Sequence, residues 1–190
     1  MSPESYNPLD IPNLGKSLTD AFLSRSLGPL PTHNFKGAGI YGIYYLPAEG
    51  GHELYRREAR GKVPIYVGKA MSLGASNTLF LRLRDHRKSI EAAPSLRVDD
   101  FQCRYLIVDD IWIPLGEQLL IDKFNPIWNR KVRGFGNKAL GGERLTQKQS
   151  DWDLLHPGRQ RSTNADNASA LIKLEAALKK YLETISDEAE

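Results

Sequence analysis

The chain has 190 residues, of which 41% are hydrophobic and 26% charged, as expected for one globular domain with extensions. No apolar run reaches the roughly 20 residues that cross a bilayer, residues 1–10 do not resemble a signal peptide, and one cysteine, Cys103, excludes a disulfide framework and a cysteine-based zinc site. We therefore expect a cytoplasmic protein that does not bind membranes. The net charge is only +3, but basic residues gather in segments 82–88 and 130–144. They indicate either a polyanionic partner or two solvated faces.

Residues 1–36 are predicted to form an N-terminal arm. This stretch is rich in proline, and apolar residues between Leu14 and Leu23 recur at the spacing of one helix face. Pro29 and Pro31 would end the helix. The arm is expected to lie on the domain or on a partner.

The next part of the chain alternates strand and helix patterns. Runs of β-branched and aromatic residues predict strands, and apolar residues three or four positions apart predict helices. The predicted elements are strands at 39–46, 64–68 and 101–108, and helices at 77–91 and 114–124. These elements predict an α/β (α+β) fold, with a small, mainly antiparallel three-stranded central sheet flanked by helices.

The first strand, GIYGIYYL, carries a doubled motif. Because side chains alternate along a strand, Tyr41 and Tyr44 should face opposite sides of the sheet. Tyr41 is the candidate functional residue, and Tyr44 is expected to pack on the other face. Residues 47–63, between the first two strands, are predicted to form an inserted hairpin extension.

The C-terminal part is predicted to contain loops and one helix. Residues 134–142 are rich in glycine, and the predicted loop continues to residue 159. Long ordered loops of this kind often carry function. After a polar linker at 160–168, apolar residues from Leu171 to Ile185 form one stripe of a last helix. That helix is expected to dock either on the core or on a second copy of the chain.

Several polar side chains stand out, although each has an ordinary explanation when taken alone. Tyr66 could simply pack within its strand, and Arg82 and His86 share one helix face, as solvated pairs often do. Glu117 lies on the apolar side of its helix, either at the rim or held inward for a purpose, and Asn129 could be a turn residue. Their order along the chain is more informative than any one of them.

That order resembles the GIY-YIG nuclease superfamily. Tyr66-Val67-Gly68 stands where that family has Tyr-Ile-Gly, Lys69 follows directly, and Arg82, Glu117 and Asn129 come in the family's order. The resemblance covers roughly residues 37–130. Further stretches make the chain similar to small type II restriction endonucleases that cut G/C-rich palindromes, and extend the match to about residue 159. These stretches are FKGAGIY, PIYVGKA, RLRDH, NPIWN, GFGN and SDWDLLHPGR.

The resemblance implies a chemistry for each matched residue. Glu117 would be the sole protein ligand of one Mg²⁺ ion per active site, with Mn²⁺ able to substitute, and Arg82 would brace the phosphate. Tyr41 would act as general base or orient the attacking water, provided that Lys69, Arg82 or the metal lowers its pKa. The expected catalytic residues are Tyr41, Tyr66, Lys69, Arg82, His86, Glu117 and Asn129.

The resemblance also implies a double-stranded DNA partner. The nuclease core would span residues 37–130, the recognition loops 131–160, and the linker and last helix 161–190. Residues expected to contact DNA are Arg133, Asn137, Lys138, Arg144 and Arg159. The expected enzyme is a homodimer that cuts both strands of a short palindrome and leaves 5′-phosphate and 3′-hydroxyl ends. The alternatives are a structure-specific or nicking repair nuclease and a catalytically silent DNA-binding module.

Overall fold

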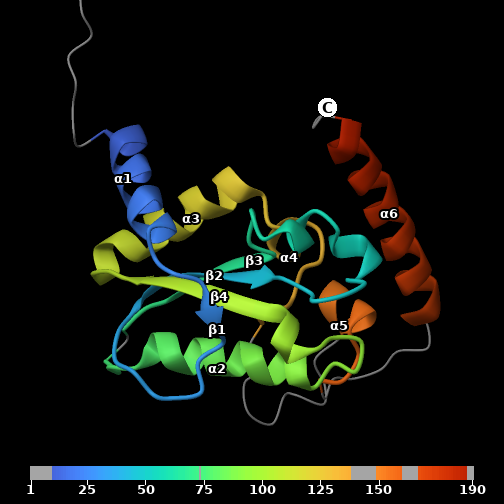
Figure 1. Cartoon of the computed structure of the whole chain (residues 1–190), viewed down its shortest axis with the longest axis horizontal. Coiled ribbons are helices and arrows are strands. Elements are labelled where there is room, and N and C mark those ends of the chain that lie inside the picture. The colour runs from blue at the N-terminus through green and yellow to red at the C-terminus, as the bar shows by residue number, and fades with distance from the viewer. Residues whose placement is uncertain (1–9, 73, 138–148, 160–166, 188–190) are drawn as a thin grey trace, which may run out of the picture.

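The computed structural model describes residues 10–72, 74–137, 149–159 and 167–187. Its centre is an antiparallel sheet of four strands in the order β1-β4-β2-β3 (Figure 1). The strands are β1 (Gly28–Pro29), β2 (Gly39–Tyr45), β3 (Tyr66–Ala70) and β4 (Phe101–Ile107). The α/β class is therefore confirmed, and so are the three predicted strands.

The expected number of strands was wrong by one. The additional strand, β1, comes from the N-terminal arm, where Gly28 pairs with Cys103 and Pro29 with Gln102 of β4. A two-residue strand that contains proline has no alternating pattern to detect. The arm's helix is confirmed as α1 (Ile11–Leu23).

The sheet separates two hydrophobic clusters. On one face, α1 and α3 (Ile113–Phe124) pack against the sheet. Phe22 of α1 and Leu120 of α3 form a cluster there with the strand residues Ile40, Val67 and Leu106. On the other face, α2 (Thr78–Glu91), α4 (Ile127–Arg130), α5 (Asp151–Leu155) and α6 (Asn167–Asp187) contribute to a larger cluster. Figure 1 shows α1 and α3 on one side of the sheet and α2 on the other.

Strand β2 divides its side chains between these clusters as its alternation predicts. Tyr41, Ile43 and Tyr45 belong to the larger cluster, and Ile40 belongs to the smaller one. The Tyr44 ring lies 5.4 Å from the guanidinium carbon of Arg104. The prediction that Tyr41 and Tyr44 occupy different faces is thus confirmed.

Two expectations for the connections were wrong. Residues 47–63 form two short 3-10 turns, Glu53–Tyr55 and Glu58–Arg60, instead of a hairpin extension. Leu54 and Tyr55 are buried there, so this segment packs into the core and does not extend the sheet. The stretch 150–159 is not all loop, because Ser150 and Asp153 form a capping box that begins α5.

The last helix docks on the core of its own chain. Leu178 is 2% exposed, and Leu171, Leu174 and Leu182 pack against the larger cluster. The sequence left open whether this helix docks on the core or on a second copy of the chain, and in the structure it docks on the core. None of the helices in the described ranges has the length and apolar character that a membrane span requires.

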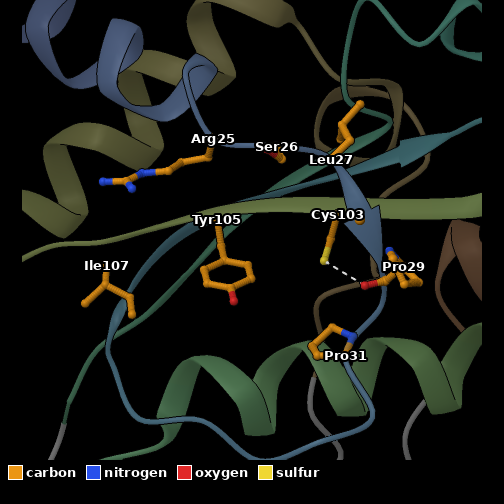
Figure 2. A pocket seen from close by; sticks show the side chains of 9 residues that line it. Arg25, Ser26, Leu27, Pro29, Pro31, Cys103, Tyr105 and Ile107 are labelled. Carbon is orange, nitrogen blue, oxygen red and sulfur yellow. Dashed lines mark hydrogen bonds between the residues drawn. The ribbon is translucent and has the colours of Figure 1, made fainter.

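A pocket of about 550 Å³ lies at the β1–β4 side of the sheet (Figure 2). It is lined by residues of the arm and by alternate residues of β4, including Cys103, Tyr105 and Ile107. The Cys103 thiol donates to the carbonyl oxygen of Pro29 at 3.7 Å, and burial raises its pKa to about 12. This thiol is therefore protonated at neutral pH and unreactive.

Candidate active site

The candidate residues gather near the opposite edge of the sheet, around strand β3. Tyr41 of β2 is fully buried, and its hydroxyl oxygen lies 2.6 Å from Nε2 of His86 on α2. The Tyr66 ring of β3 lies 5.2 Å from the His86 ring and 6.3 Å from the Tyr41 ring. Two strands and one helix thus bring together three side chains that are far apart in the sequence.

Gly68 makes room for this cluster. It pairs with Tyr41 across the β2–β3 ladder, and a Cβ atom at this position would collide with the Tyr41 phenol and lie 2.9 Å from Cε1 of Tyr66. The glycine of the Tyr-Val-Gly motif is therefore required by the two tyrosines that flank it.

Arg82 lies one helical turn before His86 on α2, and its guanidinium is directed at the same tyrosines. Its Nη2 donates to the carbonyl oxygen of Gly136. The GFG stretch predicted as part of a recognition loop therefore reaches the candidate active site. Phe135, which precedes Gly136, stacks on His86 with ring centroids 4.5 Å apart.

Lys69 and Glu117 form a second group at the same strand. Their side chains make an ion pair in which Lys69 Nζ lies 2.8 Å from Glu117 Oε2. Lys69 and its partner are 41% and 21% exposed, so they are more accessible to solvent than the tyrosines. Alternation along β3 puts Lys69 on the α3 face, opposite Tyr66. The site therefore includes residues from both faces of the sheet.

Asn129 holds the strand that carries the motif. Its Oδ1 accepts from the backbone nitrogen of Val67, and its Nδ2 donates to the carbonyl oxygen of Val67, both at 2.8 Å. The Asn129 side chain thus binds the backbone of the Tyr66-Val67-Gly68 motif. The sequence order alone could not show which backbone it binds.

The environment of Tyr41 opposes its ionisation. Burial raises the pKa of Tyr41 well above its usual value, and the nearby Tyr66 adds to this, whereas the Arg82 charge opposes it. Burial also raises the pKa of Tyr66, again against the effect of Arg82. The protein's own charges therefore do not lower the Tyr41 pKa below its usual value, because desolvation of the phenolate outweighs the arginine.

Glu117 could hold a metal ion as a single carboxylate ligand. Within the described ranges, no group of three or more histidine, cysteine, aspartate or glutamate side chains gathers to hold a metal. Mg²⁺ commonly keeps several waters and takes one or two protein carboxylates, so a single, partly exposed Glu117 fits this ion. Glu117 also raises the pKa of both tyrosines, which places its charge near them.

The residues that were expected to contact DNA differ in how far the structure exposes them to solvent. Arg133 and Asn137 are exposed, and Lys138 and Arg144 lie outside the described residues. Arg159 is only 10% exposed: its Nε donates to Asp153 at 2.7 Å, and its two terminal nitrogens donate to the carbonyl oxygens of Phe135 and Gly134. The structure thus gives Arg159 partners within the chain, and its contact with DNA stays a prediction.

Comparison with protein families finds a family whose model includes all the residues of this site. A family model described as the Eco29kI GIY-YIG domain matches residues 33–182, which is most of the chain. This chain belongs to the GIY-YIG restriction endonuclease family. Comparison with curated proteins finds no match.

The GIY-YIG match extends beyond the residues in which the sequence resemblance was found. Beyond residue 159 it includes most of α6, so this helix is part of the family domain. The resemblance did not assign roles to Phe135 and Gly136. The GFGN stretch marked the segment, but nothing in it indicated that the phenylalanine would stack on a histidine 49 positions earlier.

Proposed function

We propose that the chain is a Mg²⁺-dependent type II restriction endonuclease that hydrolyses both strands of a short palindromic DNA site. The observation that carries this proposal is the gathering of Tyr41, Tyr66, Arg82 and His86 next to the Lys69–Glu117 pair. Such a site offers a proton acceptor, a planar cation for a phosphate, and a carboxylate for a metal ion. Those are the components that phosphodiester hydrolysis requires.

The buried tyrosine and histidine are proposed to prepare the attacking water. Because its pKa is raised, Tyr41 is a neutral phenol, and it donates to Nε2 of His86 when the imidazole carries its proton on Nδ1. Its oxygen can then accept a hydrogen bond from the water. As water attacks the phosphorus, its proton passes to the Tyr41 oxygen while the phenol proton passes to His86. The phenol therefore never needs to be a free phenolate.

The charged residues are proposed to bind the phosphate. Arg82 presents a guanidinium that can brace two phosphate oxygens as negative charge develops. Tyr66, which is 8% exposed, orients this network, and Asn129 fixes the strand beneath it. Glu117 would hold Mg²⁺ or Mn²⁺, which supplies charge stabilisation for the leaving 3′ oxygen when bound. Lys69, which pairs with Glu117 in this structure, would be able to turn towards a phosphate if the carboxylate held the ion.

The target and assembly follow from the same proposal. A chain with one site would cut a palindrome as a homodimer, with each subunit cutting one strand. Arginine bound to guanine is the commonest specific base contact, so Arg133 and the recognition segment favour a G/C-rich site. The products would carry 5′-phosphate and 3′-hydroxyl ends. The enzyme would act in the cytoplasm.

A digest of plasmid DNA with and without Mg²⁺ tests the proposal. Discrete fragments that appear only with the metal are the expected result, and sequencing their ends gives the site and the position of the cut. Accumulation of nicked circles would indicate a repair or nicking nuclease instead. Retarded but intact DNA would indicate a DNA-binding module without activity.

A further inference from the structure

Four successive carbonyl oxygens next to the candidate active site accept hydrogen bonds from three residues elsewhere in the chain. The backbone nitrogen of Trp152 donates to Arg133 at 3.0 Å. Arg159 donates to Gly134 and Phe135, both at 3.1 Å. Arg82 donates to Gly136. The backbone of residues 133–136 is therefore fixed between Arg159 on one side and Arg82 on the other.

Arg159 is itself held firmly. Its Nε pairs with Asp153, whose side chain is 4% exposed, and its guanidinium carbon lies 4.4 Å from the centre of the Trp152 ring. The other carboxylate oxygen of Asp153 accepts from Ser150 at the start of α5. Because this ion pair is buried and fully hydrogen-bonded, Arg159 has a fixed orientation from which both carbonyl oxygens can be reached.

The other side of the 133–136 segment touches the candidate catalytic residues. Phe135 is 1% exposed and lies nearly parallel to the His86 ring, at an angle of 19°. It also meets the edge of Tyr66 at 5.0 Å. At Gly136 there is no room for a Cβ atom, which would collide with the Tyr66 hydroxyl and lie 3.3 Å from Nη2 of Arg82.

We propose that Phe135 and Arg159 are positioning residues for the cleavage reaction. Arg159 fixes the backbone of 134–135, and this backbone holds the Phe135 ring against His86 and the Gly136 carbonyl against Arg82. The stack limits rotation of the imidazole, so Nε2 stays directed at Tyr41, and the carbonyl sets the plane of the Arg82 guanidinium. This inference rests on the proposed function, because it concerns the rate of that reaction.

Two substitutions test this proposal, one at the Arg159 guanidinium that binds the backbone and one at the Phe135 ring that stacks on His86. Arg159→Lys keeps a positive charge for Asp153, but an ammonium cannot reproduce the planar fork that binds two carbonyls. Phe135→Leu keeps an apolar side chain but removes the stacked ring. In each variant we expect the single-turnover rate at saturating enzyme to fall roughly 100-fold, the effect of a misplacement of about 1 Å. The affinity for DNA should not change.

Two matched controls separate positioning from general packing. Arg57 also donates to two successive carbonyls, those of Phe124 and Asn125, away from the tyrosine cluster. Phe35 also forms a stacked pair, with Tyr105 at 4.9 Å, at the pocket side of the sheet. Arg57→Lys and Phe35→Leu should therefore cleave at the wild-type rate.

The experiment measures cleavage, affinity and histidine spectra on the full chain. Cleavage and affinity are measured on a DNA fragment that carries the site found from the plasmid digest. The imidazole signals of the four histidines are recorded by NMR without DNA. We expect the His86 signals to move in Phe135→Leu and Arg159→Lys and to stay in place in both controls.

The outcomes distinguish this inference from the proposed function. If the wild-type chain cuts DNA and both variants cut as fast, or if the His86 signals do not move, Phe135 and Arg159 are not positioning residues. A weaker affinity of Arg159→Lys with an unchanged single-turnover rate would show that Arg159 contacts DNA instead. If the wild-type chain does not cut DNA at all, the proposed function fails, and this inference fails with it.

Discussion

The hydroxyl oxygen of Tyr41 lies 2.6 Å from Nε2 of His86, although the two residues are 45 positions apart in the chain. This pair joins the central strand β2 to helix α2 inside the larger hydrophobic cluster. Because both side chains are almost completely buried, bulk water cannot compete for the bond. A neutral phenol next to an imidazole is suited to passing a proton, and this property leads to the first prediction.

Tyr41→Phe should lose cleavage, whereas Tyr44→Phe should retain it. The first substitution removes the hydroxyl that contacts His86 and that is proposed to accept the proton of the attacking water. The second removes a buried hydroxyl that has no hydrogen-bond partner within the described part of the chain. Tyr44→Phe should therefore be at least as stable as the wild type, because an unsatisfied buried hydroxyl is costly. Plasmid digestion and urea unfolding measure both effects, and an active Tyr41→Phe with an inactive Tyr44→Phe would reverse the assignment.

Glu117→Ala should abolish metal-dependent cleavage and leave DNA binding intact. Glu117 is the proposed metal ligand, and its ion pair with Lys69 is partly exposed, so the free energy of unfolding should change by no more than about 1 kcal/mol. Asp122→Ala is the matched control, because it removes another carboxylate from the same helix. Digestion assays with Mg²⁺ and gel-shift assays check the two properties. Mg²⁺-dependent cutting by Glu117→Ala would refute the assignment of the metal ligand.

Gly68→Ala should disturb the site through a single methyl group. The new Cβ would press on the rigid, fully buried Tyr41 phenol, and overpacking of this kind costs about 1–3 kcal/mol. Cleavage should be lost at temperatures where the variant remains folded. Gly28→Ala is the control, because no atom lies within 4 Å of a Cβ at that strand position. Equal activity and equal urea midpoints for the two alanine variants would contradict this explanation of the glycine.

In His156→Gln, the free energy of unfolding should fall less on acidification than it does in the wild type. The His156 imidazole is fully buried between the Tyr55 hydroxyl at 2.5 Å and the Ser95 hydroxyl at 2.9 Å. Burial, followed by the charges of His52 and Arg159, lowers its pKa to about 3. The Tyr55 hydroxyl can donate to Nε2 only while that nitrogen carries no proton.

The sign of the effect follows from proton binding. The unfolded chain, with a histidine pKa near 6.5, binds a proton below that pH, and the folded chain does not until about pH 3. The contribution of His156 to stability is therefore present above pH 6.5 and is lost as the pH falls towards 3. Between pH 7 and pH 5 the wild type should lose about 2 kcal/mol more than His156→Gln in urea unfolding. Parallel losses in the two proteins would show that His156 is protonated in the folded state.

The sequence predicts those parts of the fold that follow from local patterns. Alternation along GIYGIYYL separated Tyr41 from Tyr44, and the four-residue spacing of Arg82 and His86 placed both on one helix face. Each of these predictions depends only on the period of a strand or helix.

The rest depends on contacts between distant segments. Arg159 has the same charge as an arginine that binds DNA, and only the folded chain shows that it is bound to Asp153 and to two carbonyls. Strand β1 has two residues and no pattern of its own, because its pairing is determined by β4. The pKa of Tyr41 could not be predicted either, since the arginine that lowers it is visible in the sequence but the burial that raises it is not.

The bonds between Asn129 and Val67 have a consequence for assembly. Strand β3 is an edge strand of the sheet, and its outer side would otherwise present unpaired backbone groups to another chain. The Asn129 carboxamide occupies the amide and carbonyl of Val67, and the backbone nitrogen of Trp128 donates to Ile65 at 3.0 Å. Two consecutive residues thus substitute for part of a fifth strand. At these positions the strand that carries the Tyr-Val-Gly motif has no free backbone groups with which to pair with the edge of a second molecule.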